Sequence, residues 1–263
     1  NLICRKSLLR GFDESLIKLV EENLHLKGIN LFLKEEVKNI RLHKNIKKIT
    51  LKYSNKILLA NEILVAIGRS PDIEKLNLKS IGIKLNTRNA IKVDKDLRTN
   101  IKNIFAIGDV TDRFNLTPVA IAEGQFLSNM LFGKIKNKHV KLDNIGTAVF
   151  SSPPISSIGL TEKEAKKKYK KIEIYESKFI SLKYSIVNKK IPTYIKLVVN
   201  GNNKRILAAH MFGEEAPEVI QLLAVAIEAK ATIDNFNNTM AIHPTVAEEL
   251  VTFKGPTRKI NRV

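Results

Sequence analysis

The sequence contains very little cysteine. Cys4 is the only cysteine among 263 residues, so these residues cannot form an internal disulfide. A single thiol also excludes a zinc site built from several cysteines and a redox-active Cys-x-x-Cys pair within the chain. Any dithiol chemistry would therefore need thiols from outside these residues.

Long apolar runs are also missing. The longest candidate, Val219 to Ile227, is interrupted by Gln221, whereas a membrane-spanning helix needs about 20 mainly apolar residues. Residues 1–10 are apolar and then basic, which is the opposite order to a secretory signal. We therefore expect no membrane partner and a cytoplasmic location.

Acidic residues are in deficit. The chain has 26 Asp and Glu against 45 Lys and Arg, a formal net charge of +19. Such a charge attracts polyanions, nucleic acid included. The lysines, however, are scattered over the chain, and only residues 166–171 form a dense run, at the end of an expected helix. We favour a solvated surface and expect no nucleic-acid partner, with a non-catalytic dimerising or polyanion-binding fragment as the alternative from a different class.

Residues 1–70 have the pattern of the later part of a nucleotide-binding α/β domain. A helix is expected over 13–27, with Gly28 as its C-cap, and the apolar run over 62–67 is typical of a strand buried on both faces. Shorter strands are expected at 2–4, 29–33, 48–53 and 57–59, the last two as a hairpin. The first strand has nothing before it to pair with, so we expect a truncated piece of a longer protein.

Residues 71–142 form a second segment. It has a buried strand expected over 103–107 and a helix from its N-cap, Thr117, to Gly133.

From about residue 143 the pattern changes to an α+β domain. Its expected elements are helices beginning at Thr161 and Pro217 and strands at 147–150, 172–182, 194–199 and 205–212. The wide apolar surface of the last helix, 217–230, favours burial against another subunit.

Two turns follow the expected buried strands. Gly68 and Arg69 follow one strand, and Gly108 and Asp109 follow the other. In open α/β sheets, ligands bind beyond the carboxyl ends of strands, where glycine lets the backbone approach closely. Asp109 could accept hydrogen bonds from ribose-like hydroxyls, and Arg69 could meet a phosphate. The alternative is that Asp109 only caps turn amides.

The helix that begins at Thr117 is a further candidate. Its start presents free backbone N–H groups and the positive end of the helix dipole, which suit an anion or an electron-rich carbonyl. An ordinary capped helix explains the same pattern.

His243 and Glu248 are the candidate catalytic pair. Pro244 constrains the backbone after His243, as a candidate cis bond, and turns the chain so that Glu248 can return to the imidazole. The alternative is structural, because Thr245 to Glu248 is itself a capping-box pattern that would occupy the carboxylate. A lone histidine is also more often structural than catalytic.

Basic residues crowd the end of the first expected strand. Arg5, Lys6 and Arg10 lie there, and no acidic residue occurs between Asn1 and Phe12. At this place in a dinucleotide-binding domain, an acidic residue holds the ribose 2′-hydroxyl of NAD, whereas arginine accommodates the 2′-phosphate of NADP. NADP is therefore expected, with general surface basicity as the alternative.

Five segments occur in order along the chain: residues 9–13 (LRGFD), 66–71 (AIGRSP), 106–109 (AIGD), 116–124 (LTPVAIAEG) and 243–245 (HPT). Together they resemble the flavin-dependent pyridine nucleotide–disulfide oxidoreductases, and most closely the glutathione reductase branch. The resemblance implies an α/β fold with the end of a Rossmann-like NADPH domain over 1–70. It implies a central FAD-contacting segment over 71–142 and an α+β dimerisation domain over 143–263.

The resemblance also implies which residues bind the cofactors. Asp109, with Gly108, would bind the ribityl–pyrophosphate part of FAD, and the helix start at Leu116 and Thr117 would face the flavin ring. Arg5 and Arg10 resemble the pair that recognises the NADP 2′-phosphate, with a spacing one residue short. Arg69 resembles a cofactor-side arginine. No metal site is expected.

For His243 the resemblance implies a general acid/base that protonates the departing thiolate of a disulfide substrate, with Glu248 orienting the imidazole. In this family the histidine serves the active site of the partner subunit. The resemblance therefore also implies a homodimer through residues 143–263.

The departures from the family concern its redox centre and its substrate site. The redox-active disulfide and both glycine-rich cofactor motifs would lie upstream of Asn1, and Cys4 alone cannot replace a cysteine pair. Gln125 stands where glutathione reductases usually have an arginine against the glutathione carboxylate, and glutamine cannot form a bidentate ion pair.

The parent reaction is expected to pass electrons from NADPH to FAD, then to a cysteine pair, then to glutathione disulfide or a similar small disulfide. The fragment alone is expected to be inactive. Dihydrolipoamide dehydrogenase, or another reductase of low-molecular-weight disulfides, is the alternative within the family. Residues 116–118 and the basic end of the first strand disfavour the dehydrogenase.

Overall fold

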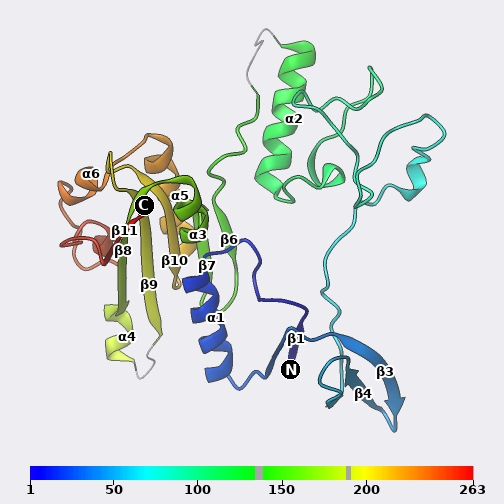
Figure 1. Cartoon of the computed structure of the whole chain (residues 1–263), viewed down its shortest axis with the longest axis horizontal. Helices are drawn as coiled ribbons and strands as arrows, with labels where there is room; N and C mark the ends of the chain where they lie inside the picture. Colours follow the sequence, from blue (N-terminus) through cyan, green and yellow to red (C-terminus); the bar gives the residue numbers. More distant parts are fainter. Residues whose placement is uncertain (134–138, 188–190, 263) are drawn as a thin grey trace. The chain divides into compact units, whose positions relative to one another are not determined.

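The computed structural model describes residues 1–133, 139–187 and 191–262 (Figure 1). The chain divides into two compact units, one made of residues 1–63 with 143–263 and the other of residues 64–142. The predicted segments 1–70, 71–142 and 143–263 were assigned by the role expected for each and not by compactness. They stay a prediction.

The first unit is built on a six-stranded antiparallel sheet with the strand order β11-β8-β9-β10-β7-β6 (Figure 1). The strands are β6 (Thr147–Val149), β7 (Ile155–Gly159), β8 (Lys171–Ile180), β9 (Pro192–Asn200), β10 (Ile206–Phe212) and β11 (Arg258–Asn261). The predicted α+β character of this region is confirmed. The predicted strand end at Leu182 is wrong, because helix α4 (Leu182–Ile186) begins there.

Alternation along the central strands gives each face of this sheet its own core. Alternate residues of β9 from Ile195 to Val199 pack with α5 (Ala216–Glu228), α6 (Ile233–Asn237) and η3 (Ala247–Leu250). Alternate residues from Tyr194 to Val198 lie on the opposite face, which is covered by α1 (Glu14–Leu26) and α3 (Glu162–Lys168). The predicted capping box of α3, formed by Thr161 and Glu164, is confirmed.

Helix α1 is capped at its start and held near its end by the loop between β6 and β7. Asp13 is its N-cap and accepts a hydrogen bond from the Ser15 N–H at 3.0 Å. Near the other end, Lys27 Nζ donates to the Ser152 carbonyl oxygen at 2.6 Å. Its buried face packs with side chains of β7, β9 and β10, the cluster being Leu16, Leu19, Val20, Ile155, Tyr194 and Phe212. The C-cap is Lys27 rather than the predicted Gly28, which follows it with φ +74°.

Two smaller sheets complete the first unit. Strand β1 (Leu2–Cys4) pairs in parallel with β2 (Leu31–Leu33). Strands β3 (Val37–His43), β4 (Ile46–Leu51) and β5 (Ile57–Ala60) form an antiparallel sheet. The predicted hairpin of β4 and β5 is confirmed, whereas β3 was not predicted.

The second unit has one long helix, α2 (Thr117–Phe132), and two short 3₁₀ turns, η1 (Glu74–Leu76) and η2 (Gly108–Thr111). Its small core is formed by Ile73, Ile83, Ile91 and Ala106. The N-cap of α2 is Leu116, which corrects the predicted N-cap Thr117, and no side chain caps this end.

Both predicted buried strands of this region are wrong. Residues 62–67 form no strand, and Leu64 and Ile67 are 93% and 82% exposed. Within 103–107 the only ladder contact among the described residues is an isolated bridge between Phe105 and Arg98. Apolar side chains are present as expected, but a strand also needs a neighbouring strand, and no strand among the described residues pairs with residues 62–67.

Gly159 offers a test of the sheet packing. It has φ +81°, and a Cβ there would lie 2.2 Å from the carbonyl oxygen of Leu207. Gly28 has a similar φ of +74° with nothing within 4 Å, so it is a matched control. We expect Gly28→Ala to lower the free energy of unfolding by about 1 kcal/mol through backbone strain alone. Gly159→Ala adds overpacking and should cost about 2–4 kcal/mol. Urea unfolding measures both, and equal losses would contradict the packing at β7 and β10.

Candidate functional site

His243 and Glu248 are brought together at one edge of the first unit. His243 Nδ1 lies 3.0 Å from Oε2 and 3.3 Å from Oε1 of Glu248, and the His243–Pro244 bond is cis. The Thr245 hydroxyl accepts the Glu248 N–H at 3.1 Å, but the carboxylate goes to the imidazole instead of closing a capping box. The expected contact between the two side chains is confirmed, and their catalytic role stays a prediction.

The pair is arranged to present one ring nitrogen outward. The side chain of His243 is 78% exposed and that of Glu248 is 20% exposed. A carboxylate on Nδ1 holds the imidazole in one orientation and places the N–H at Nδ1. Nε2 has no hydrogen-bond partner within the described parts of the chain. This nitrogen can therefore exchange a proton with a molecule that docks against the surface.

The turn that was predicted to hold a cofactor is built around Gly108. Gly108 has φ +67°, and a Cβ there would lie 3.1 Å from the Cβ of Ala120, so the turn fits tightly against α2. The next residue, Asp109, is exposed. Its carboxylate caps no turn amide within the residues described here, contrary to the structural alternative for it. The carboxylate is thus available to hydroxyl donors.

Glu123 was missed as a member of this site. It is 1% exposed, and its carboxylate accepts the Gly108 N–H at 2.7 Å and pairs with Arg113. Glu123 lies in the segment AIAEG, which carries the family resemblance, but the sequence predicted no role for it. The signal that could have found it is a carboxylate within an otherwise apolar stretch of the helix. Glu123 holds the turn of Gly108 and Asp109 against the helix.

The start of α2 and this turn suit the group that the resemblance implies. The N-terminus of α2 has no side-chain cap. Pro118 has no N–H, and the Val119 and Ala120 N–H groups donate to the Leu116 carbonyl oxygen. The donors left at this end, among the described residues, are the N–H groups of Leu116 and Thr117, at the positive end of a 16-residue helix. These donors match an electron-rich ring carbonyl, and Asp109 matches a hydroxyl-bearing chain. All of these residues lie in the second unit, and the fit to FAD rests on this donor and acceptor set.

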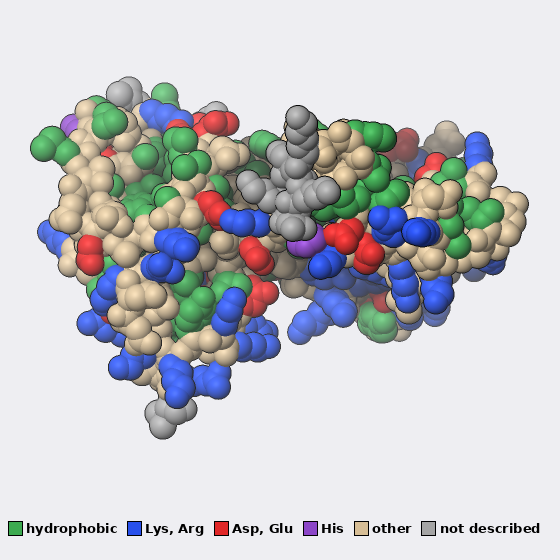
Figure 2. Space-filling view, turned by 90° about the horizontal axis from the view of Figure 1, so that it is seen from above, with side chains coloured by type: hydrophobic (Ala, Val, Ile, Leu, Met, Phe, Trp, Pro, Cys, Tyr) green, Lys and Arg blue, Asp and Glu red, His purple; other side chains and the backbone are tan. Residues whose placement is uncertain are grey.

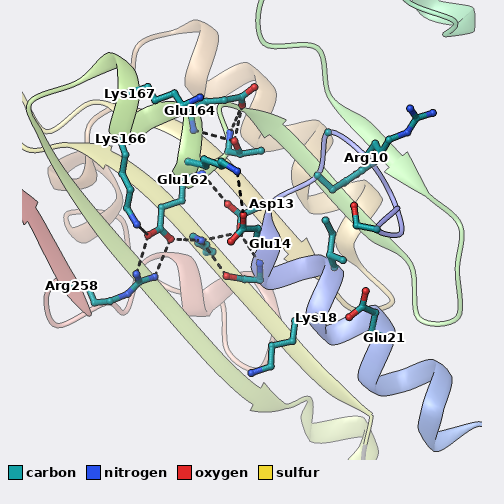
Figure 3. A pocket seen from close by; sticks show the side chains of 18 residues that line it. Arg10, Asp13, Glu14, Lys18, Glu21, Glu162, Glu164, Lys166, Lys167 and Arg258 are labelled. Atoms are coloured by element: carbon teal, nitrogen blue, oxygen red, sulfur yellow. Dashed lines mark hydrogen bonds and ion pairs between the residues drawn. The ribbon is translucent and has the colours of Figure 1, made fainter. Parts of the chain in front are cut away.

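The three predicted arginines lie in different units. Arg5 follows β1 and Arg10 precedes α1, and both are exposed. Arg10 also lines a cavity of about 1130 Å³ beside α1 and α3, most of whose lining residues are charged (Figure 3). Arg69 belongs to the exposed segment of the second unit, so no geometry relates it to the other two.

A buried ionic cluster at the base of this cavity was not predicted. Lys196 is 1% exposed, and its Nζ lies 2.8 Å from Asp13 Oδ1 and 2.6 Å from Glu162 Oε2. Arg258 binds both oxygens of Glu162 at 2.9 and 3.0 Å, and Lys166 adds a contact of 2.7 Å. Burial alone would raise the pKa of Glu162, but these three cations lower it to about 2.

His210 lies beside this cluster and is 1% exposed. Its Nδ1 is 3.0 Å from the Ser157 hydroxyl and its Nε2 is 3.2 Å from the Leu160 carbonyl oxygen. Burial lowers the pKa of His210 below its ordinary value of 6.5, although the nearby Asp13 carboxylate acts in the opposite direction. A charged residue inside the apolar strand TYIKLVV was the sequence signal for the whole cluster.

On the face shown in Figure 2, Lys and Arg side chains occur over much of the surface, with acidic side chains among them. Within the parts of the chain that the structure describes, no helix is long and apolar enough to cross a membrane, and no cluster of three metal-ligating side chains occurs.

Two family descriptions cover most of the sequence. Residues 2–124 match the description "Pyridine nucleotide-disulphide oxidoreductase", and residues 145–253 match the dimerisation domain of the same family. The chain belongs to the pyridine nucleotide-disulphide oxidoreductases. The resemblance seen in the sequence is confirmed at this level, as is the mixed α/β fold with a dimerisation domain.

Curated relatives place the chain within this family. It is 38% identical to glutathione reductase of Burkholderia cepacia over 94% of the chain and 55% of that protein. It is also 38% identical to glutathione reductase of Yarrowia lipolytica, over 96% of the chain and 56% of that protein. Trypanothione reductase of Trypanosoma congolense is 37% identical over 95% of the chain and 51% of that protein. The chain spans about half the length of the curated relatives it matches.

A solved structure agrees with the fold. The HOCl-induced flavoprotein disulfide reductase RclA of Escherichia coli superposes with a TM-score of 0.84 at 25% sequence identity. The match covers 95% of this chain and 57% of that one.

The buried cluster makes the stability of the chain depend on pH. Because the pKa of His210 is lowered in the folded state, the unfolded state takes up a proton first as pH falls below 6.5. We expect the free energy of unfolding to fall between pH 7.5 and 5.5 with a slope of up to about 1.4 kcal/mol per pH unit from this residue. Glu162 gives a second decrease as pH falls from 4.5 towards 2, because its folded pKa is about 2.

The variant His210→Gln isolates the first decrease. Glutamine stays neutral, so the loss between pH 7.5 and 5.5 should shrink, while wild type and variant should respond alike between pH 7.5 and 9. Urea unfolding at each pH, followed by circular dichroism, measures the difference. An unchanged slope in the variant would show that His210 is not the group responsible.

Proposed function

We propose that this chain is the C-terminal part of an NADPH-dependent, FAD-containing disulfide reductase of the glutathione reductase type. The observation that carries the proposal is the pair of His243 and Glu248, with Nδ1 held by the carboxylate and Nε2 facing outward. The family membership and the similarity to two glutathione reductases support it.

The cofactor-binding roles follow the donor and acceptor groups described above. Asp109 would accept hydrogen bonds from the hydroxyl-bearing chain of FAD, and the N–H groups of Leu116 and Thr117 would donate to its ring. FAD, when bound, supplies the ring that accepts hydride from the pyridine nucleotide. Arg5 and Arg10 bind the 2′-phosphate of NADPH through charge-assisted hydrogen bonds, and Arg69 binds on the cofactor side.

His243 moves protons for the disulfide. When a thiolate attacks one sulfur of the substrate, the S–S bond breaks and its electron pair leaves with the second sulfur. His243 Nε2 gives that departing thiolate a proton, and Glu248 keeps the imidazole in the orientation that this transfer needs. A positioned general acid of this kind typically contributes a factor of about 10²–10⁴ to the rate.

A second copy of the chain is the expected partner. The dimerisation domain of the family matches residues 145–253. On α5 the apolar side chains of Leu222 and Val225 are 73% and 64% exposed. We propose that residues 143–263 form a homodimer and that His243 serves the active site of the partner subunit.

The substrate is glutathione disulfide or a similar small disulfide. Gln125, which follows the AIAEG segment of α2, supplies an amide where the glutathione reductase pattern has an arginine. An amide can hydrogen-bond a carboxylate but adds no charge to the contact. Glutamine at this position therefore favours a substrate whose binding depends less on an ion pair with one carboxylate. Glutathione disulfide and other small disulfides are the substrates to compare.

Cofactor preference tests the proposal. The coding DNA upstream of the Asn1 codon is read, and the protein encoded by the whole reading frame is assayed with NADPH and with NADH. We expect a cysteine pair and glycine-rich loops upstream, and a preference for NADPH of at least about tenfold, because each charge-assisted contact contributes about 1.5–3 kcal/mol. Preference for NADH would favour a dihydrolipoamide dehydrogenase. A start codon directly before Asn1 would favour a dimerising or polyanion-binding role.

The variant His243→Gln tests the proton transfer in the same full-length protein. Disulfide reduction should slow by about 10²–10⁴-fold, whereas reduction of the flavin by NADPH should be unchanged. Glu248→Gln keeps an acceptor near Nδ1 and should cost less. His43→Gln, in the exposed hairpin of β3 and β4, is the matched control. If His243→Gln and His43→Gln have the same rates, the proposed role of His243 is wrong.

A further inference from the structure

A row of polar side chains crosses the sheet beneath α1. Strand pairing places Ser157 of β7 beside His210 of β10, His210 beside Lys196 of β9, and Lys196 beside Glu176 of β8. The row separates two apolar clusters on the same face, one under α1 and one under α3. A polar row between two apolar clusters is a specific place for one polar partner to dock.

Asp13 is that partner. It is 2% exposed, and both of its carboxylate oxygens are occupied (Figure 3). Oδ1 accepts the Ser15 N–H and lies 2.8 Å from Lys196 Nζ, while Oδ2 accepts the Glu162 N–H at 2.9 Å. One side chain thus caps α1 and joins the helix to β9 and to the start of α3.

This contact specifies the position of α1 in a way that its apolar face does not. The stabilisation from burying Leu16, Leu19 and Val20 is roughly proportional to the apolar area removed from water, and it has little directional preference. A buried ammonium group, in contrast, must keep its carboxylate partners, because burying an unpaired charge is very unfavourable. Lys196 therefore fixes where Asp13 and the first turn of α1 lie.

The loop that carries the two nucleotide-binding arginines ends at Asp13. Residues 5–12 connect β1 to the helix, and Arg10 lies three positions before the cap. Leu9 and Gly11 have φ of 48° and 92°, and the Phe12 N–H donates to the Leu9 carbonyl oxygen at 3.2 Å. Leu8, Leu9 and Phe12 pack against the same apolar cluster as α1. A shift of Asp13 would displace this short loop.

We propose that Lys196, acting through Asp13, is a positioning residue for the nucleotide 2′-phosphate site. The sheet of the dimerisation domain then orders residues 5–12 and holds Arg10 where it meets the phosphate. The inference rests on the proposed function for the identity of the ligand. It adds a specific contact by which one domain sets the nucleotide preference of the other.

The test uses Asp13→Ser and Asp13→Asn in the protein encoded by the whole reading frame. Lys196→Met is unsuitable, because it would leave the buried carboxylate of Asp13 without its lysine partner. Serine and asparagine both cap helices well, so the two variants keep α1. Only asparagine is long enough to keep an oxygen near Lys196 Nζ. Lys183→Met, which removes an exposed lysine paired with Glu214 and Glu215, is the control.

Two measurements are made on each variant. Hydrogen–deuterium exchange reports the order of residues 5–12, with β9 and β10 as the internal reference. Calorimetric titration compares adenosine 2′,5′-bisphosphate with adenosine 5′-monophosphate, which lacks the 2′-phosphate. For Asp13→Ser we expect exchange over residues 5–12 to be at least about tenfold faster and the preference for the bisphosphate to fall about tenfold. Asp13→Asn should retain most of both properties, and Lys183→Met should change neither.

The outcomes separate this inference from the proposed function. If Asp13→Ser and Asp13→Asn behave alike, the effect of Asp13 is helix capping and the inference is overturned. Unchanged exchange and unchanged preference in Asp13→Ser overturn it as well. If the wild type shows no preference for the bisphosphate, the proposed NADPH specificity is wrong, and the exchange data alone decide whether Lys196 orders the loop.

Discussion

The ion pair between Lys196 and Asp13 is the contact on which the arrangement of the first unit depends. It joins residues 183 positions apart in the sequence, and it lies where α1 meets the six-stranded sheet. Lys196 also binds Glu162, which Arg258 binds through both oxygens, so strands β9 and β11 and the start of α3 share one network. Removing one member of such a buried network leaves its partners uncompensated, which costs more than the pair itself contributes.

The candidate functional residues are divided between the two units. The first unit holds the pair of His243 and Glu248, and it carries Arg5 and Arg10 on the loop before α1. The second unit holds the turn of Gly108 and Asp109 against the open start of α2, with the buried carboxylate of Glu123 as the support. Each set of residues is fixed by contacts within its own unit. The chemistry we propose needs both sets, together with a cysteine pair that these residues do not contain.

The features that sequence analysis predicted correctly are those determined by neighbouring residues. The capping box of α3 needs only Thr161 and Glu164, and α1 needs only its spacing of apolar residues. The pairing of His243 with Glu248 spans five positions and follows from the turn at Pro244. In contrast, Lys196, Asp13 and Glu162 come from distant segments, and nothing local shows that they meet. The strands expected at 62–67 and 103–107 failed for a related reason, because apolar composition does not supply a neighbouring strand.

The exposed run from Leu64 to Ile67 has a practical consequence for the chain as a separate molecule. It combines unpaired backbone N–H and C=O groups with large apolar side chains, and it has high β-propensity. Such a segment is a template for adding a strand from another molecule, which is how edge-to-edge aggregation begins. Any segment that covers this run would therefore also protect it against self-association.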